Sequence, residues 1–185
     1  MGALALGLVP LGVLVVRAAL GELGANPVET VTHETGEWAL RCLILALCVT
    51  PARRWLGWSW LAPERRTFGL LAFGYACLHV ATYLLLDLEL DFSALAKDVL
   101  KRPYITAGFT AFVSLIPLAA TSTRAAMKRL GPRWIRLHRL TYVAAIAACI
   151  HFLWLVKADL LEPGIYAAVV GGLLIVRIRR PRSRH

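Results

Sequence analysis

Long apolar segments constrain this sequence more than any other feature. Six of them are candidates for membrane-spanning helices: residues 3–20, 38–50, 68–86, 104–120, 139–156 and 164–178. A transmembrane helix needs roughly 20 apolar residues, so the second and sixth segments are short, and we expect Thr50-Pro51 to end the second. The chain has 185 residues and is 58% apolar, more than a soluble domain of this size can bury. We therefore expect one all-α domain over residues 1–185, an integral membrane bundle of six transmembrane helices.

The distribution of charge predicts the orientation of these spans. Fifteen of the 21 Lys and Arg residues lie on one side: in the loops after the second and fourth segments, at the start of the fifth, and at or after the end of the sixth. Ten of the 11 Asp and Glu residues lie on the opposite side. Cytoplasmic loops of membrane proteins carry the excess of Lys and Arg. We therefore expect both termini in the cytoplasm and a multi-pass location in the bacterial inner membrane. Topology accounts in this way for the net charge of +10, and nucleic acid is not an expected partner.

Two further features concern the ends of the spans. The first segment lacks a basic leader and a clear cleavage site, so we expect it to be a retained helix. The periplasmic loop 87–103 has apolar residues at helical spacing, which predicts a short surface helix there. No internal repeat stands out.

Two histidines occupy matching depths in two predicted helices. His79 lies 13 residues after Arg66, and His151 lies 13 residues after His138. At 1.5 Å per residue, both are about 20 Å from the cytoplasmic side. Helix bundles build cofactor sites from facing helices, and imidazole is a common axial ligand of haem iron. We expect His79 and His151 to bind one haem iron, the alternative being neutral structural histidines that hydrogen-bond a neighbouring helix.

A third histidine, His138, lies about 20 Å nearer the cytoplasm and is a candidate axial ligand of a second haem. No other transmembrane histidine lies at its level, so the second ligand of that iron is unidentified. Residues 13 apart in a helix point in directions that differ by about 220° around the helix axis. His138 and His151 can therefore face one interior only if the helix bends or lies between cofactors.

Several arginines are candidate partners of anionic groups. Arg41 follows Glu37 by four residues, which favours an ion pair within the helix, but it also lies near the depth of the predicted haem and could bind a haem propionate. A second candidate site, for an anionic cofactor such as a flavin phosphate, lies near the cytoplasmic ends of the third and fifth helices. Its residues are Arg65, Arg66, Trp134, Arg136 and Arg139. Topology alone is the simpler explanation for most of these arginines.

Several short motifs also follow one another in order along the chain. They are Leu23-Gly24-Ala25-Asn26-Pro27, His33-Glu34-Thr35-Gly36, Arg65-Arg66-Thr67-Phe68-Gly69-Leu70, Leu78-His79, Lys101-Arg102-Pro103-Tyr104, Thr121-Ser122-Thr123, Leu130-Gly131-Pro132-Arg133-Trp134, Leu137-His138-Arg139-Leu140-Thr141-Tyr142 and Ile150-His151-Phe152-Leu153-Trp154. In sequence and spacing they resemble the MsrQ family, formerly called YedZ, of haem-binding membrane subunits within the ferric-reductase-like transmembrane proteins. The resemblance covers about residues 23–180.

The resemblance implies a function in electron transfer. Members of that family take electrons from the quinone pool, or from a cytoplasmic flavin reductase, and pass them to MsrP. MsrP is a periplasmic molybdopterin enzyme that reduces methionine sulfoxide in periplasmic proteins. By position, the implied haem ligands are His79, His138 and His151, for one or two b-type haems, and FMN binding is also implied. We expect a non-catalytic subunit of an oxidoreductase that forms a heterodimer with MsrP.

Two other functions compete with this one. A stand-alone ferric or superoxide-generating reductase would need a cytoplasmic domain for NAD(P)H and FAD, and we expect no such domain within these 185 residues. A non-redox membrane protein with structural histidines would bind no haem, and helices broken by glycine and proline would be typical of a transporter.

Overall fold

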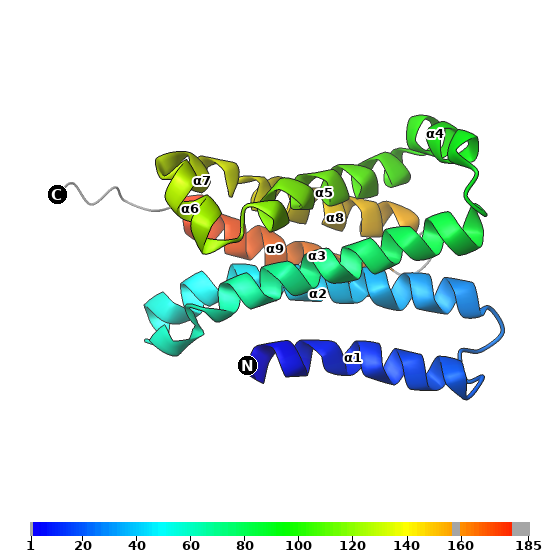
Figure 1. Cartoon of the computed structure of the whole chain (residues 1–185), viewed down its shortest axis with the longest axis horizontal. Coiled ribbons are helices and arrows are strands. Elements are labelled where there is room, and N and C mark those ends of the chain that lie inside the picture. Colours follow the sequence, from blue (N-terminus) through cyan, green and yellow to red (C-terminus); the bar gives the residue numbers. More distant parts are fainter. Residues whose placement is uncertain (1, 157–159, 179–185) are drawn as a thin grey trace.

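Every regular element that the structure describes is helical, as the fold class predicted. The computed structural model describes residues 2–156 and 160–178, and Figure 1 shows its helices. They are α1 (Gly2–Ala19), α2 (Pro27–Trp55), α3 (Glu64–Thr82), α4 (Phe92–Lys101), α5 (Pro103–Ala120), α6 (Arg124–Leu130), α7 (Pro132–Leu137), α8 (Leu140–Leu155) and α9 (Leu161–Ile178). A short 3-10 helix (Ser59–Leu61) precedes α3, and a π-helical turn (Tyr83–Asp87) follows it.

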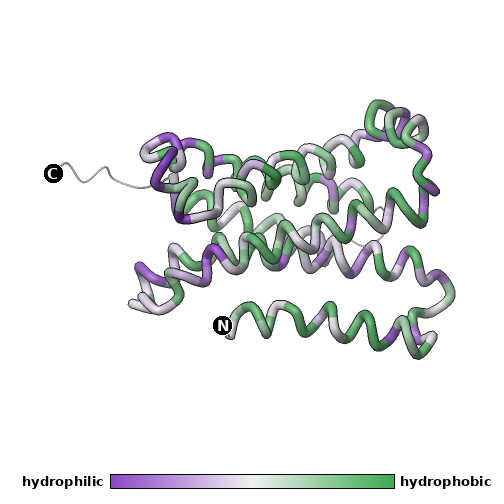
Figure 2. Tube along the Cα trace, viewed as in Figure 1, coloured by the Kyte–Doolittle hydropathy of each residue, from purple (hydrophilic) through white to green (hydrophobic). Residues whose placement is uncertain are grey.

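The long helices run side by side along the longest axis of the molecule (Figure 1). Within the described residues, five segments are long and apolar enough to cross a membrane: α1, α2, Ser59–Asp87 around α3, α5 and Pro132–Leu155 around α8. Their outward faces are rich in exposed apolar side chains, for example Leu6 at 73% exposure. Hydrophilic residues gather toward the two ends of the bundle (Figure 2). This is a multi-pass membrane protein with lipid as the solvent of its apolar surface.

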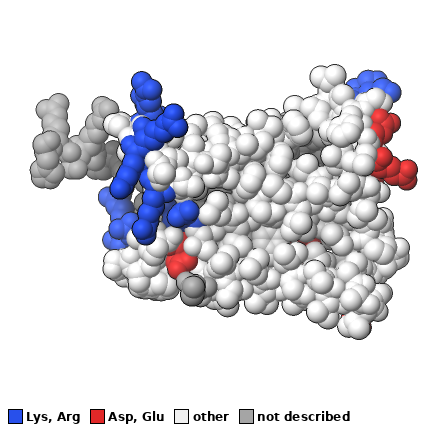
Figure 3. Space-filling model, viewed as in Figure 1, with Lys and Arg blue, Asp and Glu red and all other residues white. Residues whose placement is uncertain are grey.

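The two ends of the bundle differ in charge (Figure 3). We call the end formed by α6, α7 and the last turns of α2 and α9 the basic end. Its described Lys and Arg residues are Arg53, Arg54, Arg65, Arg66, Arg124, Lys128, Arg129, Arg133, Arg136, Arg139 and Arg177. The opposite end carries α4 and the start of α2, and we call it the acidic end. Its surface helix α4 confirms the prediction for the loop 87–103.

Helix α2 is far longer than the predicted second span, residues 38–50. It begins at Pro27 because Asn26 caps it: the Asn26 side chain accepts a hydrogen bond from the backbone N–H of Glu29, and proline suits the first helical position. His33, which precedes the predicted second span, is therefore on helix α2. An apolar window detects only the part of a helix that faces lipid, which is why the polar first turns were missed.

The predicted end of this helix at Thr50-Pro51 was also wrong. Pro51 is buried inside α2, which continues to Trp55. Proline has no N–H, so the carbonyl of Leu47, four residues earlier, lacks its helical donor. Arg177 of α9 supplies one, because its Nη2 donates a hydrogen bond to the Leu47 oxygen at 2.5 Å. A distant side chain thereby satisfies a backbone group that lipid could not.

The interior consists of two helix pairs, α2 with α3 and α5 with α8. Small residues such as Ala72, Ala144 and Ala145 have no exposed surface, which lets the helices approach closely. Helix α1 is more peripheral: its Gly7 packs against Leu71, and the Tyr75 hydroxyl donates a hydrogen bond to the Gly7 carbonyl at 2.7 Å. Arg17 of α1 forms an ion pair with Glu34 of α2.

Candidate functional site

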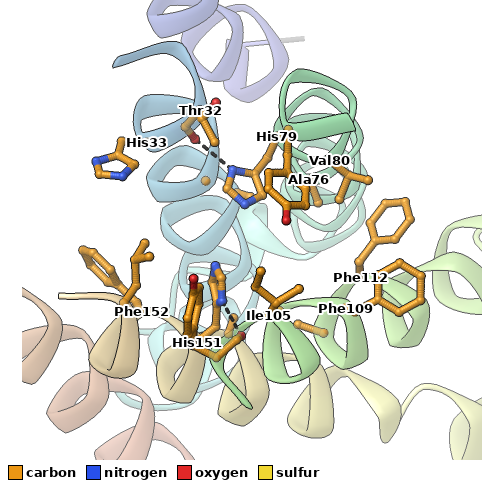
Figure 4. Close-up of a pocket in the computed structure, with 18 of the residues that line it drawn as sticks. Thr32, His33, Ala76, His79, Val80, Ile105, Phe109, Phe112, His151 and Phe152 are labelled. Carbon is orange, nitrogen blue, oxygen red and sulfur yellow. Dashed lines mark hydrogen bonds between the residues drawn. The ribbon is translucent and has the colours of Figure 1, made fainter. Parts of the chain in front are cut away.

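His79 of α3 and His151 of α8 face one another across a cavity between the two helix pairs (Figure 4). Their ring centroids are 6.1 Å apart, and the ring planes lie at 75° to each other. The expectation that these two histidines share one level of the bundle is therefore confirmed. The cavity has a volume of about 600 Å³, within the usual range for ligand sites, and its lining is mostly apolar.

A backbone carbonyl of a neighbouring helix orients each ring. His79 Nδ1 lies 2.8 Å from the carbonyl oxygen of Thr32 in α2, and His151 Nδ1 lies 2.6 Å from that of Tyr104 in α5. A carbonyl only accepts hydrogen bonds, so each Nδ1 must carry the proton and donate. The other ring nitrogen, Nε2, is then left with a free lone pair. Such a bond to the second nitrogen is typical of metal-binding histidines.

The spacing of the rings suits a metal held between two Nε2 atoms. Two metal–nitrogen bonds of about 2 Å and two ring radii of about 1.1 Å add up to roughly 6 Å between centroids. Among the described residues, no group of three or more His, Cys, Asp or Glu side chains is arranged to hold a metal ion by itself. An iron porphyrin needs only two axial ligands from the protein, because it supplies its other four itself. The donor set, the distance and the apolar cavity therefore fit a haem.

Two glycines give the rings the space that they occupy. A Cβ atom on Gly36 of α2 would lie 2.9 Å from His79 Nδ1, and one on Gly108 of α5 would lie 2.8 Å from His151 Nδ1. Neither glycine was predicted from the sequence, although one signal was present. Each glycine precedes its histidine by 43 residues, so the two pairs repeat with the same internal separation.

Charged side chains and a third histidine line the part of the cavity near the acidic end of the bundle. They are Glu29, His33, Glu37, Asp87 and Arg102. Arg102 and His33 are the basic candidates here for binding carboxylates of a ligand, and the sequence had not singled out either for that role. Arg102 already forms an ion pair with Asp98 at 3.1 Å, on an exposed part of the surface.

Arg41 has carboxylate partners within the protein. Its guanidinium bonds to Glu37 at 2.7 Å, approaches Glu162 at 3.4 Å and donates to the Tyr166 hydroxyl at 2.7 Å. It also lies over the Trp38 ring. The ion pair with Glu37 is the one that the four-residue spacing favoured.

His138 lies away from the cavity, at the junction of α7 and α8. Its ring stacks on Trp134 with a centroid distance of 3.8 Å, and its Nδ1 is 3.1 Å from the Trp134 carbonyl oxygen. Arg65 is close enough to interact with it electrostatically. The remaining predicted anion-binding residues of the basic end, Arg66, Arg136 and Arg139, are exposed. The structure thus brings Trp134 and His138 into contact but does not gather the arginines around one described cavity.

Comparison with known proteins identifies relatives along most of the chain. The family described as ferric reductase like transmembrane component matches residues 35–149. Three relatives are named protein-methionine-sulfoxide reductase heme-binding subunit MsrQ. The one from Rhodospirillum rubrum is 49% identical over 88% of this chain and 81% of its own length. Those from Herminiimonas arsenicoxydans and Azospira oryzae are 48% and 52% identical, over 92% and 84% of this chain and 80% and 68% of their own lengths. No solved structure matches.

The family match and these relatives agree with the helical membrane bundle. They show that the chain belongs to the MsrQ family of ferric-reductase-like transmembrane proteins.

Proposed function

We propose that this protein is a haem b electron-transfer subunit, itself non-catalytic, of a methionine sulfoxide reductase system. In this proposal it carries electrons from the quinone pool, or from a cytoplasmic flavin reductase, across the bacterial inner membrane to the periplasmic molybdoenzyme MsrP. MsrP then reduces methionine sulfoxide in periplasmic proteins. The observation that carries the proposal is the pair of facing imidazoles of His79 and His151, 6.1 Å apart in an apolar cavity.

A haem iron with two imidazole ligands supplies one-electron redox chemistry. The chain's own residues would prepare both imidazoles for it. The carbonyls of Thr32 and Tyr104 hold the proton on Nδ1 of each ring, so that Nε2 is the free donor. Apolar side chains, such as Phe112 and Phe152, line the cavity and would limit the access of water to a bound haem. Arg102 and His33, which line the cavity, are the proposed partners of the propionates. Arg41, which pairs with Glu37 and Glu162 in the middle of α2 and does not line the cavity, is a further proposed partner.

Helix length and charge support the proposed topology. Helix α9 has 18 residues and is about 27 Å long, close to the roughly 30 Å of a hydrocarbon core. With the five long apolar segments it completes six spans, arranged as one domain over residues 1–185. The basic end is the proposed cytoplasmic end, because Lys and Arg accumulate in cytoplasmic loops. With six spans, both termini are proposed to lie on that side of the membrane. The acidic end would then face the periplasm, where it is the surface proposed to dock MsrP.

The basic end is the proposed entry point for electrons. His138 is the proposed ligand of a second haem. Its stacking on Trp134 places an aromatic pair beside basic residues, which also suits an FMN phosphate. The proposed FMN-binding residues remain Arg65, Arg66, Trp134, Arg136 and Arg139.

The decisive experiment counts haem in protein purified from haem-replete cells. Pyridine haemochrome quantitation and a redox-titrated visible spectrum should show b-type haem in the wild type. His79→Ala and His151→Ala should each lose most of this haem. Val80→Ala should retain it, because Val80 lines the cavity but cannot bind iron. His138→Ala should lose only the second haem, if two are counted.

Folding must be assessed separately, because both histidines also connect helices. Monodispersity in detergent provides the check, and the cavity variant His79→Gly supplied with free imidazole should regain haem. A colourless wild type, or full haem in both His79→Ala and His151→Ala, would contradict the proposal and favour structural histidines.

A further inference from the structure

The two imidazole rings of the site pack closely against two glycines, Gly36 and Gly108. A Cβ atom on Gly36 would lie 2.9 Å from Nδ1 and 3.0 Å from Cε1 of His79. One on Gly108 would lie 2.8 Å from Nδ1, 3.0 Å from Cε1 and 3.1 Å from Cγ of His151. Real Cβ atoms essentially never approach within 3.0 Å of another heavy atom, so a side chain in either position must displace the imidazole or the helix that carries it.

The same helical turn supplies both the space and the hydrogen bond. Thr32 and Tyr104, whose carbonyls bind the two Nδ1 atoms, precede Gly36 and Gly108 by four residues. In an α-helix, residues four apart lie one above the other on one face. The glycine therefore lies directly beside the carbonyl that orients the ring. The imidazole reaches that oxygen only because the next position on this face has no side chain.

This arrangement occurs twice, in separate helix pairs. Each histidine lies 47 residues after its carbonyl partner. It also lies 43 residues after its glycine in both cases. The carbonyl residue, the glycine and the histidine of the second site each follow their counterparts in the first site by 72 residues. Two unrelated close contacts would not be expected to repeat this spacing. The repetition points to a role toward the rings and not to packing of one helix.

Backbone conformation does not require glycine at these positions. Only Gly21, Gly24, Gly57 and Gly131 among the described glycines have positive φ angles, and all four lie outside the long helices. Alanine is a better helix former than glycine, so a helix interior would normally favour it. The three atoms nearest to an added Cβ all belong to the imidazole ring, His79 at Gly36 and His151 at Gly108.

We propose that Gly36 and Gly108 are positioning residues that set the direction of the two Nε2 atoms toward the haem iron. This inference rests on the proposed function. A Cβ atom pushes the ring off its carbonyl, and the ring then rotates or shifts by a few tenths of an ångström or more. The Nε2 lone pair would then change direction, and the bond that this nitrogen would make to a haem iron would weaken.

The test compares alanine variants of whole protein in detergent. Gly36→Ala and Gly108→Ala are the test variants, and Gly74→Ala is the matched control, because its added Cβ in the membrane-spanning part of α3 would have no atom within 4 Å. The test variants should retain several-fold less haem, or show shifted ferric EPR g-values and a shifted midpoint potential. The control should match the wild type in all three. Test variants that are indistinguishable from Gly74→Ala would overturn the proposal.

A double-mutant cycle keeps the test valid if an alanine variant folds poorly. In apoprotein, Gly36→Ala should destabilise the fold when His79 is present and should be harmless in the His79→Ala background, where the ring is gone. If Gly36→Ala destabilised the protein equally with and without the His79 ring, the proposed contact between residue 36 and that ring would be wrong. Full haem in His79→Ala and His151→Ala would instead overturn the proposed function. Haem loss in those two, with normal Gly36→Ala and Gly108→Ala proteins, would overturn only the positioning role.

Discussion

The imidazole planes of His79 and His151 are nearly perpendicular, at 75°, although their centroids are only 6.1 Å apart. Each plane of an axial imidazole contains the metal–nitrogen bond, so this angle would be the angle between the two ligand planes on the iron. Perpendicular ligand planes leave two iron d orbitals nearly equal in energy, which makes the low-spin ferric EPR spectrum highly anisotropic. We expect one dominant large-g feature in frozen oxidised protein. A well-resolved rhombic spectrum, typical of parallel ligand planes, would contradict the observed geometry.

The depth of this pair was predictable, but its surroundings were not. Counting from the predicted cytoplasmic ends of two helices placed His79 and His151 at one level, because an α-helix rises by a constant distance per residue. The glycines and the carbonyls of Thr32 and Tyr104 depend on which faces of α2 and α5 turn inward. Residue counting along a single helix contains no such information. That the two histidines bind iron stays a prediction.

The boundaries of α2 show a second limit of the sequence. Apolar patterning locates the stretch in contact with lipid, whereas Asn26 and Pro27 determine where the helix starts. At the other end, proline normally breaks a helix, but the rule fails when a donor from elsewhere replaces the lost N–H. Arg177 is 130 residues from Leu47 in the sequence, so this compensation becomes visible only in the folded chain.

The bond between Arg177 and Leu47 leads to a stability prediction. Arg177→Met should lower the free energy of unfolding by about 1–2 kcal/mol, because the Leu47 carbonyl loses its donor inside the membrane. In a Pro51→Ala background the backbone N–H of residue 51 can satisfy that carbonyl, so the same change should cost clearly less. Unfolding in mixed micelles with increasing SDS, followed by circular dichroism, measures both. Equal losses in the two backgrounds would show that Arg177 acts in another way.

The attachment of α1 rests on few contacts and is open to a similar test. Tyr75 is only 3% exposed, and its hydroxyl bonds to the Gly7 carbonyl. Tyr75→Phe keeps the ring but loses this bond, and we expect a loss of about 1 kcal/mol in the same unfolding assay. Tyr104→Phe is the control, because its hydroxyl has only a 3.4 Å contact with Arg102. If both variants unfold alike, the Tyr75 hydroxyl does not hold α1.

The proposed orientation can be tested with single cysteines at the two ends of the bundle. The four native cysteines are unpaired and are first replaced by alanine or serine. Leu100 in α4 is 85% exposed and Ile135 in α7 is 64% exposed, so Leu100→Cys and Ile135→Cys should both be reactive. A membrane-impermeant maleimide should label Leu100→Cys in intact spheroplasts and Ile135→Cys only after permeabilisation. The charge asymmetry argues for this result, because Arg133, Arg136 and Arg139 surround Ile135 in the sequence and cytoplasmic loops carry the excess of arginine. In the six-span topology α5 crosses the membrane once between α4 and α7, so the two positions lie on opposite sides. Labelling of both positions from one side would contradict that topology.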